Sequence, residues 1–189
     1  MLEQAEAVIL PGVGAYGTAM AALRSLGLAD ALVEFARSGK TLIGICLGMQ
    51  LLMSESFEFG RHRGLGIIEG SVMRLPSSGH RPKIPQIGWN RISRPAWAAS
   101  PDEDPWRKTP LDGLPGGTFM YFVHSYYTVP VDEQQWLAVS TYGSTQFCSA
   151  LTHGNVVGLQ FHPERSADRG LQIYRTLAAL ILERRRVVA

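Results

Sequence analysis

Cysteine, charge and long hydrophobic runs are all scarce in this chain. Two cysteines among 189 residues are too few for the disulfide framework of a small secreted protein, so we expect reduced thiols and a cytoplasmic location. Charged residues make up 18% of the chain and the net charge is +2, which gives no reason to predict nucleic acid or a membrane surface as a partner. The longest apolar stretch, around residues 44–53, is too short to span a bilayer, and the first six residues do not resemble a signal peptide.

Strand-like and helix-like segments alternate along the chain, whose length suits one domain with a hydrophobic core. We expect this domain to span residues 1–189 and to be a three-layer, flavodoxin-like α/β domain with a mostly parallel central sheet. Residues 93–117, rich in Pro, Asp and Trp, are expected to form a loop. The expected strands are 7–10, 41–45, short strands over 64–94, 118–129, 136–141 and a hairpin over 146–161, and the expected helices are 18–26, 28–38, one from Leu47 onward and 171–186.

Cys46 stands between an apolar strand and an apolar helix, a position that can make a thiol reactive. Gly44 and Gly48 flank it at i−2 and i+2, where a sharp strand-to-helix turn leaves no room for Cβ atoms. The pattern is that of a nucleophile elbow, G-x-S-x-G, with sulfur in place of oxygen. A thiol at a helix N-terminus lies near the positive end of the helix dipole, so we expect a lowered pKa and a thiolate at Cys46.

A candidate base, His162, follows the last expected strand and is followed by Pro163 and Glu164. It is far from Cys46 in sequence, so the two side chains must meet through the fold. Pro163 biases His162 to an extended conformation, in which residues i and i+2 face the same side, so Glu164 can hold the imidazole. We therefore predict Cys46, His162 and Glu164 as a catalytic triad.

Each of these motifs alone has a plainer explanation. A single cysteine is more often a small buried hydrophobe, and His-Pro-Glu by itself is usually a loop. Both motifs, however, end apolar strands of an α/β chain, where open sheets carry their sites, and this favours the functional interpretation. Residues 12–17 also fit the dinucleotide fingerprint G-x-G-x-x-G, but Asp30 and Glu34 fall in a helical pattern where the fingerprint requires an acidic residue at a strand end.

The motifs resemble those of the class I, or triad, glutamine amidotransferases. The resemblance rests on Gly44-Ile-Cys-Leu-Gly-Met-Gln50 and Gln160-Phe-His-Pro-Glu164. It narrows to the branch of glutaminase subunits that serve imidazole glycerol phosphate synthase. The segments that narrow it are LPGVGAY at 10–16, PQIGWN at 85–90, YFVHSY at 121–126 and HPERS at 162–166. The resemblance implies hydrolysis of glutamine to glutamate and ammonia, with no metal and no cofactor.

The same resemblance implies roles for further residues. The backbone N–H of Leu47 would be one donor to the reaction's oxyanion, and a peptide flip at Gly12-Val13 would supply the other once a partner activates the subunit. Glycines on both sides of Val13 make such a flip sterically cheap. The residues that would hold the substrate glutamine are Gln50, Glu58, His124, Ser125 and Tyr126.

The resemblance also implies a partner, because ammonia released into water would be protonated and lost. The partner would be a (β/α)8-barrel cyclase subunit, which uses the ammonia to form imidazole glycerol phosphate and aminoimidazole carboxamide ribotide in histidine biosynthesis. The positions that match the family's interface are Trp89, Asn90, Tyr121 and Arg165, the last replacing the usual lysine. Two alternatives stay open: a glutaminase that serves another synthase, and a catalytically inactive partner-binding module.

The chain departs from the resembled family in two places. The family opens with a strand, a helix and a strand before the segment that matches Ala7, whereas six residues precede Ala7 here. We expect a misassigned start codon, the alternative being a chain that lacks these sheet strands. The loop over 93–117 looks longer than the family norm, and it either touches the partner or is solvated.

Overall fold

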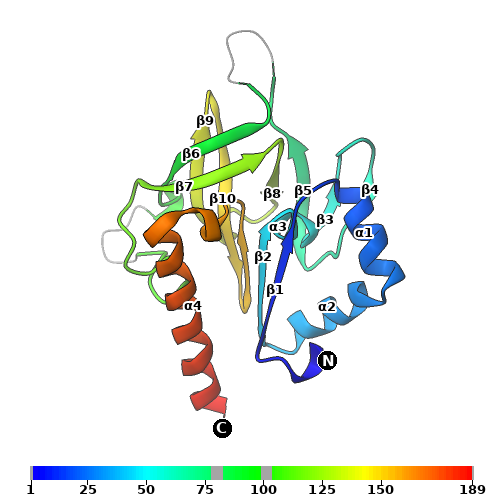
Figure 1. Cartoon of the computed structure of the whole chain (residues 1–189), viewed down its shortest axis with the longest axis vertical. Coiled ribbons are helices and arrows are strands. Elements are labelled where there is room, and N and C mark those ends of the chain that lie inside the picture. The colour runs from blue at the N-terminus through cyan, green and yellow to red at the C-terminus, as the bar shows by residue number, and fades with distance from the viewer. Residues whose placement is uncertain (1, 78–82, 99–103, 189) are drawn as a thin grey trace.

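The computed structural model describes residues 2–77, 83–98 and 104–188 and has the α/β architecture expected from the sequence (Figure 1). Its five-stranded sheet has the order β1-β2-β11-β10-β9. Strands β1, β2 and β11 run parallel, and β10 and β9 continue the sheet antiparallel, which confirms the expected hairpin of β10 and β11. These strands are β1 (Ala7–Gly12), β2 (Thr41–Cys46), β9 (Trp136–Tyr142), β10 (Thr145–His153) and β11 (Val156–Leu159).

Strand β2 is buried at all six residues, because β1 and β11 flank it and helices cover both of its faces. Leu42 belongs to a core with residues of α1, α2 and α3, while Ile43 and Ile45 pack with Leu177 of α4 on the other face. Figure 1 shows the resulting layers, with α4 on one side of the sheet and α1 and α2 on the other. The helices are α1 (Tyr16–Ser25), α2 (Leu28–Arg37), α3 (Leu47–Leu51) and α4 (Ala167–Val188).

Two smaller sheets, β4-β3-β5-β8 and β6-β7, complete the fold. Residues 118–129, which we expected to form one strand, form two, because the chain leaves β7 at His124 and enters β8 at Tyr126 in a different sheet. The break falls at Ser125. The strands are β3 (Met53–Ser56), β4 (His62–Arg63), β5 (Ile68–Arg74), β6 (Gln86–Ile92), β7 (Thr118–His124) and β8 (Tyr126–Pro130), and single 3-10 turns cover Leu2–Gln4, Ala96–Ala98, Glu133–Gln135 and Pro163–Arg165.

The segment over 93–117 is not simply solvated. Its residues 99–103 lie outside the described part, but Trp106, Leu111 and Leu114 are buried in a second hydrophobic core with residues of β6, β7, β9 and β10. This core lies next to the strands that lead into Ser125 and His162. The long segment therefore supports the fold from the inside, whatever its exposed residues contact.

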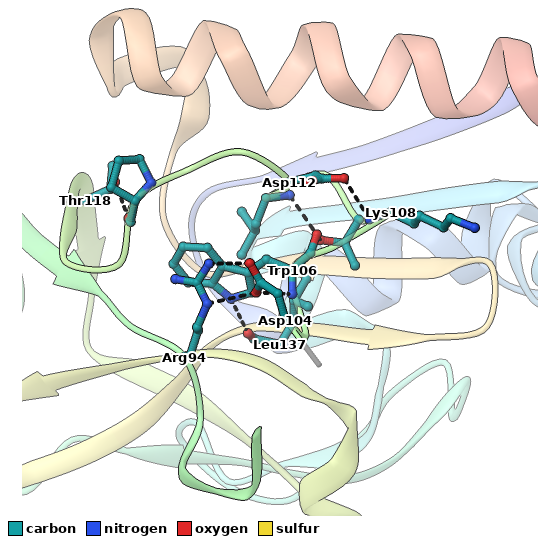
Figure 2. A network of polar contacts seen from close by, with 10 residues as sticks. Arg94, Asp104, Trp106, Lys108, Asp112, Thr118 and Leu137 are labelled. Atoms are coloured by element: carbon teal, nitrogen blue, oxygen red, sulfur yellow. Dashed lines mark hydrogen bonds and ion pairs between the residues drawn. The ribbon is translucent and has the colours of Figure 1, made fainter. Parts of the chain in front are cut away.

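Trp106 anchors this segment through three kinds of contact (Figure 2). Its side chain is fully buried, and its Nε1–H donates to the Leu137 carbonyl at 2.7 Å. The Arg94 guanidinium lies 4.2 Å from the centre of the indole ring, a cation–π contact. Arg94 in turn donates two hydrogen bonds to the Asp104 carboxylate, at 2.8 and 2.5 Å, so the ion pair closes over the ring.

We predict that Trp106→Ala lowers the free energy of unfolding by about 4 kcal/mol, because it opens a large cavity and leaves the Leu137 carbonyl without its donor. Urea denaturation measures the change. Trp97→Ala is the matched control, since Trp97 is 47% exposed in the same segment, and its effect should stay below about 1 kcal/mol. Equal losses in the two variants would show that the segment is not held by Trp106.

Candidate active site

Cys46 occupies the turn between β2 and α3 in a backbone conformation that few residues other than glycine adopt, with φ 54° and ψ −111°. The flanking glycines permit this turn. A Cβ atom on Gly44 would lie 2.7 Å from the Gly48 carbonyl, and one on Gly48 would lie 1.7 Å from the Leu10 carbonyl oxygen in β1. The sharp strand-to-helix corner expected from the sequence is present, and strained corners of this kind cluster at functional sites.

Strand β7 contacts both Cys46 and His162. The His162 N–H donates to the Tyr121 carbonyl at 2.9 Å, and the Cys46 thiol donates to the Val123 carbonyl at 3.8 Å. The two acceptors are two residues apart, so residues from distant parts of the sequence contact the same stretch of β7.

His162 and Glu164 form the expected pair. The imidazole Nδ1–H donates to Glu164 Oε1 at 2.6 Å, while Nε2 is buried and has no hydrogen-bond partner. The Ser166 hydroxyl donates to the His162 carbonyl at 2.6 Å and accepts from the Tyr121 N–H at 3.0 Å. Ser166 thus links the backbone of His162 to strand β7. A carboxylate on Nδ1 holds an imidazole in the tautomer whose Nε2 can accept a proton.

The thiol of Cys46 is protonated, whereas the helix dipole led us to expect a thiolate. Burial raises the pKa of this thiol to about 11, the Leu47 N–H beside the sulfur opposes the shift, and the Glu164 carboxylate adds to it. The expected lowering of the pKa is wrong for this state, because α3 has only five residues and the loss of solvent around the sulfur outweighs the helix terminus. Cys46 is therefore a protonated, resting thiol.

A cleft of about 280 Å³ opens beside the Cys46 sulfur. Ligand pockets commonly hold roughly 300–1,000 Å³, so this cleft suits a small metabolite better than a nucleotide. It collects every residue that we expected to hold the substrate, and also Phe59 and Val123, which the sequence motifs did not single out. Its lining consists of Val13, Gly14, Cys46, Leu47, Gln50, Glu58, Phe59, Val123, His124, Ser125 and Tyr126.

Gln50 lines the cleft, but its amide is tied to the protein. Its Nε2 donates to the Tyr126 carbonyl at 2.9 Å and to Gln160 Oε1 at 3.1 Å. Gln160 is fully buried, and its own Nε2 donates to the Cys46 sulfur at 3.8 Å. No role was predicted for Gln160 from the sequence, although its position two residues before His162 in an extended segment could have indicated that the two side chains share a face.

The segment expected to supply the second oxyanion donor lies directly against the elbow. Gly12 is the register partner of Cys46, and a Cβ atom on it would lie 3.1 Å from Leu47 Cβ. Val13 is 80% exposed, and Gly14 has a φ of 100°. The peptide groups around Val13 thus adjoin Leu47 and are not held by packing of the Val13 side chain.

Glu58 lies at the mouth of the cleft. Its carboxylate accepts a hydrogen bond from the Tyr16 N–H in the first turn of α1, where the helix dipole favours a negative charge. The carboxylate therefore contacts the helix that follows the Gly12–Gly14 turn, and it also lines the cleft. Phe59, the next residue, has a φ of 52° and lies edge-on to Tyr126, with ring centres 6.4 Å apart.

His124 forms the inner wall of the cleft and is neutral. Its ring lies among Phe122 and Phe147, its Nδ1–H donates to the Tyr126 carbonyl at 2.9 Å, and its Nε2 has no partner. Burial lowers the pKa of His124 to about 4, with the Tyr126 carbonyl opposing the shift. A neutral imidazole here offers one lone pair and brings no positive charge next to the thiol.

Three of the four residues expected at a partner interface share one outer face. Trp89 is 53% exposed and lies edge-on to Tyr121, its register partner on β7, with ring centres 6.0 Å apart. The Arg165 guanidinium covers the Tyr121 ring at 4.6 Å. Asn90 does not join them, because its Nδ2 donates to the Thr141 carbonyl of β9 at 3.0 Å and neighbouring strand residues point to opposite faces. We call Trp89, Tyr121 and Arg165 the aromatic face.

Two further properties concern the described residues only. None of the helices in 2–77, 83–98 and 104–188 is long and apolar enough to span a membrane. Within the same residues, no three His, Cys, Asp or Glu side chains gather as a metal site would require.

The depressed pKa of His124 predicts a loss of stability in acid. The unfolded chain binds a proton near pH 6.5 and the folded chain only near pH 4, so unfolding takes up a proton between these values, and the free energy of unfolding falls as the pH drops through that window. The loss attributable to His124 amounts to about 3 kcal/mol. In His124→Asn, whose Nδ2 can keep the bond to Tyr126, urea denaturation at pH 7.5 and pH 4 should give a smaller difference than in the parent chain. An unchanged difference would contradict a buried neutral His124.

Residues 2–176 match the model of the family Glutamine amidotransferase class-I. The imidazole glycerol phosphate synthase subunit HisH of Wolinella succinogenes is 45% identical over 176 residues, which cover 92% of this chain and 80% of that protein. The subunit of the same name from Aquifex aeolicus is 45% identical over 170 residues, which cover 90% of this chain and 75% of that protein.

Solved structures show the same fold at lower identity. A crystal structure of a glutamine amidotransferase has a TM-score of 0.65 and 22% identity, and the match covers 95% of this chain and 80% of that one. The structure of PurLQS from Thermotoga maritima gives a TM-score of 0.64 at 21% identity, covering 92% and 79%. The family model and the curated relatives decide the assignment, and the chain belongs to the class I glutamine amidotransferases.

Proposed function

We propose that the chain is the glutaminase subunit of an imidazole glycerol phosphate synthase. In this role it hydrolyses L-glutamine to L-glutamate and ammonia with Cys46, His162 and Glu164. The observation that carries the proposal is the buried, unpartnered Nε2 of His162, whose Nδ1 is bonded to Glu164 at 2.6 Å. The backbone N–H of His162 is bonded to β7, the strand whose Val123 carbonyl also contacts the Cys46 thiol. The relatives named HisH support the choice of synthase.

The reaction begins with transfer of the thiol proton. The Cys46 S–H turns from the Val123 carbonyl to His162 Nε2, and Glu164 stabilises the imidazolium that forms. The thiolate then attacks the side-chain carbonyl carbon of glutamine. Collapse of the tetrahedral adduct releases ammonia, which takes the proton from His162, and leaves a glutamyl thioester. Water, deprotonated by the same imidazole, attacks the thioester carbonyl, and the C–S bond breaks to release glutamate. The Cys46 thiolate then takes the proton back from the imidazolium.

The adduct's oxyanion needs two donors. The Leu47 N–H is the first, since it already lies beside the Cys46 sulfur. A peptide N–H of the Gly12-Val13 segment, turned toward the adduct when the partner binds, is the second. Because this peptide must rotate and the resting thiol is protonated, we expect the subunit without its partner to hydrolyse glutamine slowly.

Gln50, Glu58, His124, Ser125 and Tyr126 form the pocket for glutamine. The Glu58 carboxylate at the mouth suits the substrate's α-ammonium group, to which it would transfer from the Tyr16 N–H. The neutral His124 and the backbone of Ser125 and Tyr126 line the side of the cleft that would hold the substrate's polar groups.

Ammonia would pass to a (β/α)8-barrel cyclase subunit in a heterodimer, which forms imidazole glycerol phosphate and aminoimidazole carboxamide ribotide. The aromatic face is the docking surface that the proposal assigns to this partner, since exposed Trp and Arg side chains are enriched where interfaces gain most of their free energy. Such a complex acts in the cytoplasm.

The first test removes the nucleophile. In Cys46→Ala, glutamine-dependent synthesis by the complex with the barrel subunit should fall by roughly 10³-fold or more, while synthesis from added ammonium salt should be unchanged. Cys148→Ala is the control, because Cys148 is buried in the core away from the cleft and should keep glutamine-dependent activity. Glutamine-dependent synthesis that survives in Cys46→Ala would remove Cys46 from the mechanism.

The second test addresses the partner. Trp89→Ala should weaken binding of the barrel subunit by about 2 kcal/mol, roughly thirtyfold in Kd, because it removes the most exposed ring of the aromatic face. Titration calorimetry measures the Kd. Val131→Ala, which truncates an exposed apolar side chain outside this face, should leave it unchanged. If both variants bind like the parent chain, the partner docks elsewhere.

A further inference from the structure

Gln160 contacts both Gln50, which lines the cleft, and the Cys46 sulfur, and both ends of its side-chain amide are engaged. Its backbone N–H donates to the Ser149 carbonyl at 3.0 Å, its Oε1 accepts from Gln50, and its Nε2 donates to the Cys46 sulfur. The side chain is fully buried. A hydrogen bond from a buried amide to a sulfur atom is unusual, because sulfur is a weak acceptor unless it is ionised.

The orientation of this amide is set by Gln50. Gln50 Nε2 carries two N–H donors, and the Tyr126 carbonyl and Gln160 Oε1 take one each. If the Gln160 amide were flipped, its NH2 group would face the NH2 group of Gln50, and donors cannot bond to donors. The contact with Gln50 therefore forces the N–H of Gln160 toward the sulfur.

We propose that Gln160 is a positioning residue of the proposed glutaminase, whose amide N–H, held in place by Gln50, stabilises the thiolate of Cys46. A hydrogen bond to an anion is about twice as strong as one between neutral groups, so the contact strengthens when the thiol loses its proton. The Val123 carbonyl acts in the opposite sense, since it accepts from the thiol and repels the thiolate. Gln160 thus favours the reactive form, and Val123 the resting form.

The other titratable groups around the sulfur are identified by the same geometry. They are His162 and Glu164 from the segment after β11, His124 from β7, Tyr126 from β8, and Glu58, which also lines the cleft. Substitutions at Gln160 leave all five in place. A change in thiol ionisation in such variants would therefore report on the amide itself.

The test measures thiol ionisation and does not need turnover. In a Cys148→Ala background Cys46 is the one remaining thiol, and the rate of its alkylation by iodoacetamide is followed from pH 6 to pH 10.5 in the full chain, alone and with the barrel subunit. Gln160→Leu removes the donor, and we expect the apparent pKa to rise by about one unit, so that alkylation at pH 8 slows about tenfold. Both rates should rise with pH and keep a ratio of about ten over most of this range, because the whole range lies below the thiol pKa of about 11.

Gln160→Glu separates this role from packing, because glutamate keeps the shape of the side chain and an acceptor for Gln50. It adds a negative charge beside the sulfur, so alkylation at pH 8 should be slower than in Gln160→Leu. If Gln160→Leu fails to fold, the alkylation rate of Gln160→Glu relative to the background tests the proposal. Ser149→Ala is the matched control, since it alters a neighbouring buried polar side chain without touching the amide or the sulfur, and it should alkylate like the background.

Gln50→Leu tests the positioning. It frees the Gln160 amide to flip, so it should slow alkylation in the same direction as Gln160→Leu and by less, and the double variant should equal Gln160→Leu alone. Gln160 variants that alkylate with the background's pH profile would overturn the inference. The proposed function is judged separately, by glutamine-dependent synthesis in Cys46→Ala, so the failure of one is distinguishable from the failure of the other.

Discussion

The close approach of Gly48 to the Leu10 carbonyl is the constraint on which the site depends. Any Cβ at position 48 would overlap that oxygen, so α3 can begin directly against β1 only because glycine is there. The approach turns the chain sharply at Cys46 and brings the Leu47 N–H beside the sulfur. It also lays Leu47 against Gly12, so that the elbow and the turn after β1 form one wall of the cleft.

The burial of the corner at Cys46 disfavours ionisation of its thiol. β2 is enclosed on both faces and both edges, which makes its end rigid, but the same enclosure removes the water that would solvate a thiolate. Two polar groups beside the sulfur oppose this effect, the Leu47 N–H and the Gln160 amide. In the proposed mechanism, the thiol stays protonated until a proton acceptor and an oxyanion donor are both in position.

The sequence predicted the features that depend on local pattern. The strand before Cys46, the glycines around it and the His-Pro-Glu pair each follow from short-range rules, and all are present. Features that depend on tertiary packing were missed or wrong. The pKa of Cys46 depends on burial by distant elements, and the break at Ser125 depends on two sheets that the alternation of 118–129 does not distinguish. Trp106 lies in the expected loop, but its burial was not predicted, because nothing local indicates the core that it joins.

Strand β7 ties the outer face of the domain to its chemistry. The Tyr121 side chain lies on the aromatic face with Trp89 and Arg165, while its backbone N–H and carbonyl are bonded to Ser166 and His162. Two residues further on, the Val123 carbonyl holds the thiol proton in the resting state. A partner bound to the aromatic face would therefore contact the strand that is hydrogen-bonded to both His162 and the Cys46 thiol.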